Sequence, residues 1–213
     1  MFTGIIREIG VIEAVVRKGA IFEYSIHAEI TSQAVNIGSS VSVDGVCQTV
    51  VVAKEGRMIF HAVEETVKKT TLAKITPGRR VHLEPALKMG GALDGHLVYG
   101  HVDGVGRVIR KSEISGRYNL GFRVNPGLDK YLISSGSVCL NGVSLTLFKV
   151  QGAEGNVTLI PETLRSTLLG EIKIGDEINV EVDIIGKWME KLILSGTLRN
   201  TNALRESLDS MGS

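Results

Sequence analysis

Three side chains in this sequence have the types and settings that chemistry on a small organic molecule requires. Cys47 and Ser144 each lie two residues after a predicted tight turn, where a thiol or hydroxyl can add to a ring or hold it by a hydrogen bond. His101 lies in the segment 100–104, whose glycines let a ligand approach the backbone while an imidazole transfers a proton. This combination indicates nucleophilic or acid–base chemistry.

Each of these residues also has a purely structural interpretation. A lone cysteine is more often a core residue than a nucleophile, and Cys139, inside an apolar run, fits the core better than Cys47. His96 and His101 lack the spacing of a helical zinc pair and no cysteine pair accompanies them, so we predict no metal site. The nearby glycines do not have the spacing of a phosphate or dinucleotide loop, so we predict neither of these motifs.

The elements that must position these side chains come from an internal duplication. Subtracting 97 places residues 137–181 on residues 40–84 without a gap, and 12 of the 45 aligned positions are identical. Chance identity in ordinary compositions is about one in fifteen. Because two copies are too few for a solenoid, each copy must close a core of its own.

The alignment also shows where the two copies differ. Cys47 falls on Ser144, and at an offset of 96 the segment 4–6 falls on 100–102, so that Ile5 opposes His101. If the two copies hold similar ligands, these are the positions at which the ligands would be treated differently.

Both copies have the pattern of short β-strands. Asp44-Gly45 and Asn141-Gly142 are strong hairpin signals, and turns recur every 8–12 residues, which is typical of a small antiparallel barrel. The chain then changes character. Apolar residues at helical spacing predict a C-terminal amphipathic helix, followed by a polar tail after Arg199; these residues are Trp188, Met189, Leu192, Ile193 and Leu198.

Composition excludes several classes of protein. The 213 residues allow two domains of about 100 residues, and 43% hydrophobic residues suffice for a core. A net charge of +1 attracts neither nucleic acid nor a membrane surface, and we expect no membrane span and no signal peptide. Two cysteines without a secretion signal predict free thiols and a cytoplasmic protein.

Several polar positions are the same or similar in both copies. Taken singly, each is as well explained by the capping of a turn or a strand end. Taken together, they favour two related pockets for a planar heterocycle with a polyol tail, and two such pockets suit a reaction between two similar molecules. The aligned pairs are Ser40/Ser137, Thr49/Thr146, Glu65/Glu162 and Thr66/Thr163.

Five segments, in order and covering residues 1 to about 186, resemble the riboflavin synthase family. They are Met1–Ile6, Asp44–Val50, Gly95–Gly104, Asn141–Thr146 and Ile160–Leu164. The resemblance implies an all-β fold of two similar six-stranded Greek-key barrels, at 1–97 and 98–186, and a trimerisation helix and tail at 187–213. It implies a homotrimer, with each active site between the first barrel of one subunit and the second barrel of a neighbour.

The resemblance also implies a reaction. Two molecules of 6,7-dimethyl-8-ribityllumazine dismutate by four-carbon transfer, giving riboflavin and 5-amino-6-ribitylamino-pyrimidinedione, with no metal or redox cofactor. An association with lumazine synthase is a further expectation.

Motif position assigns the residues of the two pockets. For the first barrel they are Gly4, Ile5, Ile6, Cys47, Thr49, Val63, Thr66, Gly100, His101 and Val102. For the second barrel they are Ser144, Thr146, Ile160, Thr163 and Asp183. Phe2 and Ser40 shape the site, and further binding positions are Gln48, Ala62, Ser135, Leu145, Pro161 and Glu162. We expect Cys47 and His101 to assist proton transfer or nucleophile addition at one lumazine, and Ser144 and Asp183 to polarise and position the other.

The sequence departs from the family at three positions. Ser135 stands where a lysine is common, which puts an ionic contact to the substrate in doubt. Gln48 replaces a usual apolar residue, and Glu64 replaces a common proline.

Two other functions compete with this interpretation. A non-catalytic lumazine- or flavin-binding protein of the same fold would be expected to lose the polar residues of one pocket, and this chain keeps Cys47, His101, Ser144 and Asp183. An oligonucleotide-binding barrel is disfavoured by the net charge and by only 5% aromatic residues.

Overall fold

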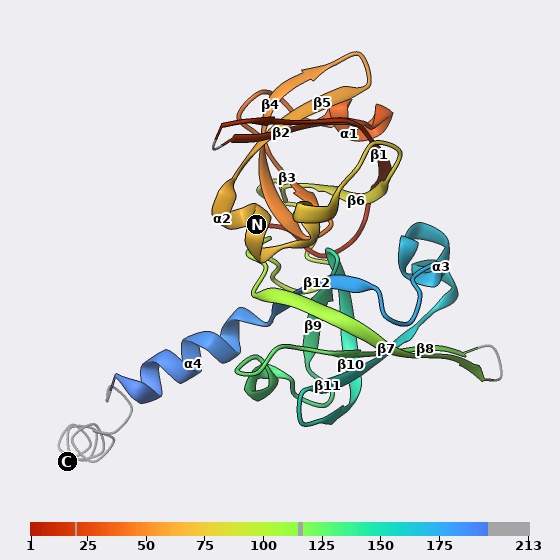
Figure 1. The fold of residues 1–213 in the computed structure, drawn as a ribbon. Helices are drawn as coiled ribbons and strands as arrows, with labels where there is room; N and C mark the ends of the chain where they lie inside the picture. Colours follow the sequence, from red (N-terminus) through yellow and green to blue (C-terminus); the bar gives the residue numbers. More distant parts are fainter. Residues whose placement is uncertain (20, 115–116, 196–213) are drawn as a thin grey trace.

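The computed structural model describes residues 1–19, 21–114 and 117–195. Its strands form two closed six-stranded antiparallel barrels, followed by one helix (Figure 1). This confirms the predicted fold class.

The first barrel has the strand order β1-β2-β5-β4-β3-β6. Short helical turns connect its strands. The elements are β1 (Glu8–Lys18), β2 (Ile21–His27), α1 (Glu29–Ala34), β3 (Ser40–Val43), β4 (Val46–Lys54), β5 (Arg57–Val63), α2 (Glu64–Lys69), the 3₁₀ helix η1 (Thr71–Lys74) and β6 (Arg80–Pro85).

The second barrel repeats this order as β7-β8-β11-β10-β9-β12. Its elements are β7 (Gly104–Ile114), β8 (Arg117–Arg123), η2 (Asp129–Tyr131), β9 (Ser137–Leu140), β10 (Val143–Gln151), β11 (Glu154–Leu159), α3 (Pro161–Ser166), η3 (Leu168–Gly170) and β12 (Glu177–Val182). The helix α4 (Ile184–Leu194) follows.

The hairpin signals form the turns that the sequence predicts. Asp44 and Gly45 have φ angles of 46° and 82°, and Asn141 and Gly142 have 45° and 83°. Two successive positive φ angles characterise the type I′ turn, whose twist matches that of the flanking strands. Both turns therefore fix the register of β3 with β4 and of β9 with β10.

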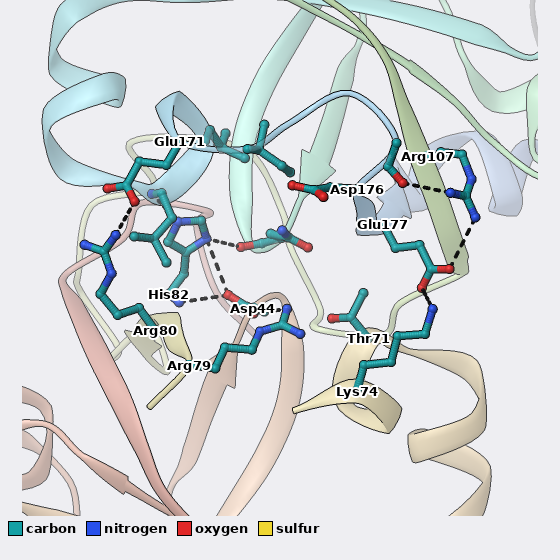
Figure 2. Close-up of a pocket in the computed structure, with 15 residues that line it drawn as sticks. Asp44, Thr71, Lys74, Arg79, Arg80, His82, Arg107, Glu171, Asp176 and Glu177 are labelled. Atoms are coloured by element: carbon teal, nitrogen blue, oxygen red, sulfur yellow. Dashed lines mark hydrogen bonds and ion pairs between the residues drawn. The ribbon is translucent and has the colours of Figure 1, made fainter. Parts of the chain in front are cut away.

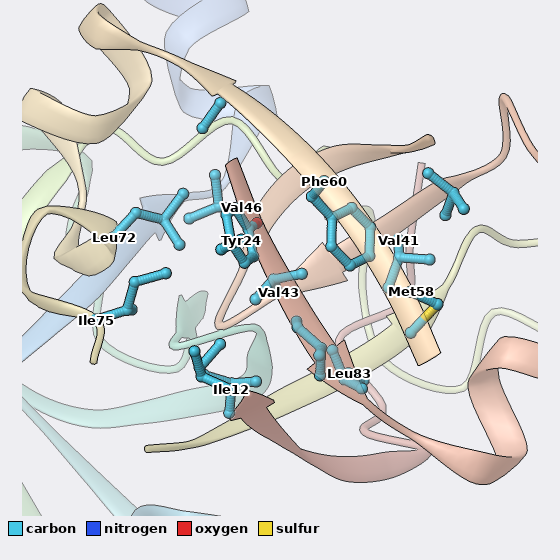
Figure 3. Close-up of a cluster of buried hydrophobic side chains, with 14 of the residues drawn as sticks. Ile12, Tyr24, Val41, Val43, Val46, Met58, Phe60, Leu72, Ile75 and Leu83 are labelled. Atoms are coloured by element: carbon cyan, nitrogen blue, oxygen red, sulfur yellow. The ribbon is translucent and has the colours of Figure 1, made fainter. Parts of the chain in front are cut away.

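Alternating side chains fill the two barrels. In the first, Tyr24 and Phe60 stack with ring centroids 5.4 Å apart, among aliphatic residues (Figure 3). In the second, Phe122 is joined mainly by leucine and valine side chains. The low aromatic content of the chain is therefore reflected in largely aliphatic cores.

Two extended segments, 1–6 and 98–102, cross between the barrels, and we call them the straps. Their backbones pair at Phe2 and Val98, with N–O distances of 2.6 and 3.1 Å. Ile6 then packs against the core of the second barrel, and Val102 belongs to the core of the first. Each barrel is thus completed by the strap that precedes the other barrel in sequence.

The barrels also meet along a polar surface, the seam, on which the two hairpin turns touch. A Cβ atom on Gly45 would lie 2.6 Å from the backbone nitrogen of Gly142, so both turns need glycine for contact as well as for φ. A cleft of about 620 Å³ opens beside this contact and is lined by charged side chains from both barrels (Figure 2).

A buried histidine bonds across the seam. His82 Nδ1 donates to the carbonyl of Asn141 at 2.8 Å, and Nε2 accepts from the N–H of Leu168 at 2.7 Å. Asn179, its counterpart in the repeat, makes the same two kinds of bond to backbone groups of the first barrel, each at 2.8 Å. His82 is therefore neutral in this arrangement, and burial lowers its pKa.

The helix α4 points away from the barrels (Figure 1). Asp183 caps its N-terminus by accepting from the N–H of Ile185 at 3.0 Å. The predicted apolar residues Trp188, Met189, Leu192 and Ile193 lie on it, and all are exposed on the single chain. Leu198 and the polar tail lie outside the described residues.

Candidate functional site

The chemical side chains lie on the outside of the barrels, beside the straps. On β4, Val46, Gln48 and Val50 are buried in the barrel, so Cys47 and Thr49 face outward. The strand β10 repeats this alternation, and Ser144 and Thr146 face outward there. We call the surface around Cys47 and the strap 98–102 the first mouth, and that around Ser144 and the strap 1–6 the second mouth.

At the first mouth, the strap lies directly against Cys47. The Cys47 N–H donates to the carbonyl of Gly100 at 2.8 Å. Gly100 has a φ of 72°, and a Cβ there would lie 2.7 Å from the Cβ of Cys47, so this position requires glycine. His101 follows directly, is exposed, and stacks on Tyr99 with ring centroids 6.0 Å apart. The structure thus places Cys47 and His101 at the same mouth.

The second mouth repeats this geometry with Ser144. Its N–H donates to the carbonyl of Gly4 at 2.8 Å, and a Cβ on Gly4 would lie 2.6 Å from the Cβ of Ser144. The Ser144 hydroxyl differs from the Cys47 thiol in having a histidine partner: its Oγ lies 2.7 Å from Nδ1 of His96.

Two buried glutamates hold the straps in place. Glu84 accepts from the N–H groups of Thr3 and Gly4 at 2.7 and 3.0 Å, and Glu181 accepts from those of Tyr99 and Gly100 at 2.7 and 2.9 Å. Burial raises the pKa of both carboxyls, and the hydrogen bonds from the straps partly counteract that rise.

These two glutamates, which we call the clamps, act across the seam. Glu84 lies in the first barrel but holds the strap of the second mouth, and Glu181 does the reverse.

One part of the sequence-based assignment is wrong. Gly4, Ile5 and Ile6 were placed in the pocket of the first barrel, but their strap lies against Ser144 and the core of the second. Alignment identifies equivalent positions and not the barrel on which a segment lies. Gly100, His101 and Val102 do lie on the first barrel, as predicted.

Other predicted positions lie on or beside the short helices α2 and α3 and on β3. Val63 and Ile160 are the exposed N-cap residues of α2 and α3, with 62% and 59% of their surface accessible. Thr66 and Thr163 are half-buried one turn further on, and Ser40 pairs with Thr49 across β3 and β4.

Some predicted positions reach a mouth less directly. The side chains of Gln48, Ala62 and Leu145 point into the barrels, and buried Phe2 joins the straps. On α3, Pro161 is the first residue, and Glu162 forms an exposed ion pair with Arg165. Their part in binding stays a prediction.

Ser135 and Asp183 are two further predicted site residues. Ser135 is exposed and has a φ of 67°, where the first copy has Gly38. Asp183 lines a groove of about 490 Å³ between α4 and the second barrel, together with Ile133, Ser137 and Met189.

His96, Glu84 and Glu181 are parts of the site that the sequence patterns do not predict. The two glutamates had a signal, because both copies carry a glutamate at the same position, between apolar neighbours near the end of a strand. His96 had none beyond its place before the glycine-rich strap.

Metal sites and membrane-spanning helices are both absent from the described residues. Within 1–19, 21–114 and 117–195, no group of three or more metal-binding side chains comes together. In the same ranges, no helix has the length and apolar character needed to cross a membrane.

Two closed barrels with equivalent strap-covered mouths define a protein with two lumazine-binding domains, and the family model of the lumazine binding domain matches residues 3–86 and 99–183. The riboflavin synthase of Bacillus subtilis (strain 168) is 37% identical over 193 residues, which is 91% of this chain and 90% of the relative. That of Photobacterium phosphoreum is 38% identical over 91% of this chain and 89% of its own length. The chain therefore belongs to the riboflavin synthase family of enzymes.

Solved structures show the same fold. The crystal structure of LumP complexed with riboflavin matches with a TM-score of 0.79 at 23% identity, covering 86% of this chain and all of LumP. LumP complexed with 6,7-dimethyl-8-(1'-D-ribityl) lumazine matches with a TM-score of 0.77 at 22% identity.

Proposed function

We propose that this enzyme dismutates two molecules of 6,7-dimethyl-8-ribityllumazine to riboflavin and 5-amino-6-ribitylamino-pyrimidinedione. One lumazine gives a four-carbon unit to the other. The two products together contain all atoms of the two substrates, so the reaction consumes no oxidant, reductant or net water. The observation that carries the proposal is the pair of equivalent mouths. Each consists of outward-facing side chains of a β-strand and a strap whose glycine lies directly against that strand.

The chemistry asks the protein mainly for binding and orientation. The C7 methyl of the lumazine is acidic because its anion delocalises into the ring. A site that holds two rings together avoids an entropic cost of about 7–11 kcal/mol. It must also accept a proton and stabilise the anion. Outward hydroxyls, backbone groups and one imidazole at each mouth fit these needs.

The differences between the mouths support different roles for their residues. Cys47 and His101 at the first mouth assist proton transfer or nucleophile addition at one lumazine. Ser144 and Asp183 at the second polarise and position the other. The test is steady-state conversion of lumazine to riboflavin, followed by flavin absorbance, in the wild type, Cys47→Ser and His101→Ala. Near-normal turnover in both variants would refute this division of labour.

Binding without turnover is the competing function, and the same assay separates the two. If the wild-type protein binds lumazine but forms no flavin, it is a lumazine- or flavin-binding protein of this fold. The presence of His96 with Ser144 and of His101 near Cys47 favours the enzyme.

We further propose a homotrimer formed through α4, with active sites between the first barrel of one subunit and the second barrel of a neighbour. The support is the row of exposed apolar residues on α4, Trp188, Met189, Leu192 and Ile193. Their removal from water would stabilise an interface at about 25 cal/mol per Å². Sedimentation of a chain truncated before Lys187 tests this, and an unchanged trimer would refute it.

The cellular setting follows from the same proposal. Both cysteines are free thiols, which fits a reducing cytoplasm. An association with lumazine synthase, the expected source of the substrate, stays a prediction from the family.

A further inference from the structure

The imidazole of His96 contacts the hydroxyl of Ser144 at the second mouth. Nδ1 and Oγ lie 2.7 Å apart, which is the distance of a strong hydrogen bond. Cys47 is the counterpart of Ser144 in the repeat, and within the described residues no histidine hydrogen-bonds its thiol. In this part of the chain the serine–histidine pair therefore distinguishes the second mouth from the first.

The backbone around His96 is built to hold this contact. The His96 N–H donates to the carbonyl of Thr3 at 3.1 Å. A Cβ atom on the preceding Gly95 would lie 2.1 Å from the Thr3 carbonyl oxygen and 2.9 Å from the Cβ of Ser144. The segment 95–96 is thus wedged between the strap 1–6 and Ser144, and the imidazole has little freedom to leave the hydroxyl.

The surroundings keep the imidazole neutral near pH 7. Burial lowers the pKa of His96, and the negative charge of Asp183 only partly offsets this effect. A neutral imidazole has one nitrogen that accepts, whereas an imidazolium can only donate. A serine hydroxyl has one proton to give and two lone pairs.

We propose that His96 is a positioning residue for Ser144. Its Nδ1 accepts a hydrogen bond from the Ser144 hydroxyl, so that the Oγ lone pairs face the ligand of the second mouth. The inference rests on the proposed function, which supplies lumazine as that ligand. When the imidazole gains a proton, Nδ1 donates to Oγ instead, and the hydroxyl must turn its own proton away from His96. The serine then offers its proton to the lumazine and keeps only one free lone pair to accept with.

The test compares His96→Ala with the conservative His96→Asn. Because misplacement of a catalytic group typically costs about 10- to 100-fold, we expect kcat of His96→Ala to fall by about that factor, with little change in lumazine affinity. Asn offers an amide oxygen that can accept from Ser144, and the seam shows Asn179 making the bonds that His82 makes in the other copy. His96→Asn should therefore retain most of kcat and lose the acid limb of the kcat–pH profile below about pH 6.5.

Two controls make the result specific to Ser144. His27→Ala removes an exposed histidine far from the mouths in sequence and should leave kcat unchanged. Adding His96→Ala to Ser144→Ala should cause no further loss, because the histidine acts through the hydroxyl. Wild-type kcat in His96→Ala, equal losses in His96→Ala and His96→Asn, or an additive double variant would overturn the inference.

The proposed function is tested separately by the wild-type protein. If the wild type binds 6,7-dimethyl-8-ribityllumazine without forming riboflavin, that function fails. The role of His96 is then measured by the pH dependence of lumazine fluorescence quenching, which His96→Asn must flatten and His27→Ala must not. An unaltered profile in His96→Asn would overturn the inference in that case.

Discussion

The two barrels have the same strand order and the same turns, yet their seam surfaces carry opposite charges. Three cations of the first barrel fall on three acids of the second: Lys74/Glu171, Arg79/Asp176 and Arg80/Glu177. Arg80 pairs with Glu171 across the seam, and Lys74 pairs with Glu177 at 2.7 Å (Figure 2). The alignment of the two copies turns one of these ion pairs into the other with the charges reversed.

This difference shows that the copies have become complementary and are no longer interchangeable. If two first barrels faced each other in this way, Lys74 of one would lie near Arg80 of the other. The two Asp44 side chains would also be buried close together where the turns touch. In the observed seam, neutral Asn141 stands opposite Asp44 instead. Like charges at such a contact are destabilising, so the seam favours the unlike barrel.

The mouths differ in the same way. Each has an outward nucleophile or hydroxyl and one histidine, but Cys47 and His101 occupy the first and Ser144 and His96 the second. Identical scaffolds with different proton-handling groups suit two identical molecules that must have different fates.

The largest expected effect comes from breaking the crossed clamps. Glu84→Ala leaves two buried backbone N–H groups without an acceptor, so the free energy of unfolding should fall by about 2–4 kcal/mol. Glu84 holds the strap 1–6, which covers Ser144, so Glu84→Ala should also weaken ligand binding at the second mouth. Glu181→Ala should weaken ligand binding at the first mouth. Denaturant unfolding and riboflavin titration measure both, with exposed Glu55→Ala as the control. Damage confined to the barrel that carries the mutation would contradict the crossing.

A smaller effect is expected from the pH dependence of the seam. His82 has a lowered pKa when folded, so its contribution to stability is present above about pH 6.5 and is lost as pH falls through the folded pKa. His82→Asn copies Asn179 and should leave stability at pH 8 within about 1 kcal/mol of the wild type. It should also flatten the loss of stability between pH 7 and pH 5.

The buried glutamates have raised pKa values and act with the opposite sign, since their contribution is lost as pH rises. Both Glu84 and Glu181 remain in His82→Asn, so comparing that variant with the wild type isolates the histidine. An unchanged profile, or the same change in the exposed His27→Asn, would contradict the role of His82.

The smallest effect tests charge complementarity. Lys74→Glu should reduce the free energy of unfolding by about 0.5–1 kcal/mol, because Lys74 is largely exposed in its pair with the half-buried Glu177. Adding Glu177→Lys should restore only part of it, because Glu177 also pairs with Arg107, and high salt should shrink both changes. Lys54→Glu, at an exposed pair away from the seam, controls for net charge. A double variant no more stable than Lys74→Glu would contradict the complementarity.

The strands, turns and duplication were predictable because they depend on local patterns that occur twice. The turn at Asp44-Gly45 needs only its own residues, and the repeat at Asn141-Gly142 supports it. The short helices α2 and α3 were missed because six residues give no helical period to recognise.

The mouths were predictable as residue sets but not as assemblies. The offset shows that Gly4 corresponds to Gly100, yet only folding reveals that each strap crosses to the other barrel. The contact of His96 with Ser144 joins residues 48 positions apart. Such a contact depends on packing that no sequence period encodes.

The central claim is that each barrel offers one mouth for one ring system. Equilibrium titration of the protein with riboflavin, the product that does not react further, counts the sites directly. We expect two riboflavin molecules per chain in the wild type, and one each in Thr49→Trp and Thr146→Trp, whose exposed positions allow a bulky ring to block one mouth without entering a core. A single site in the wild type, or two sites in both variants, would contradict the account.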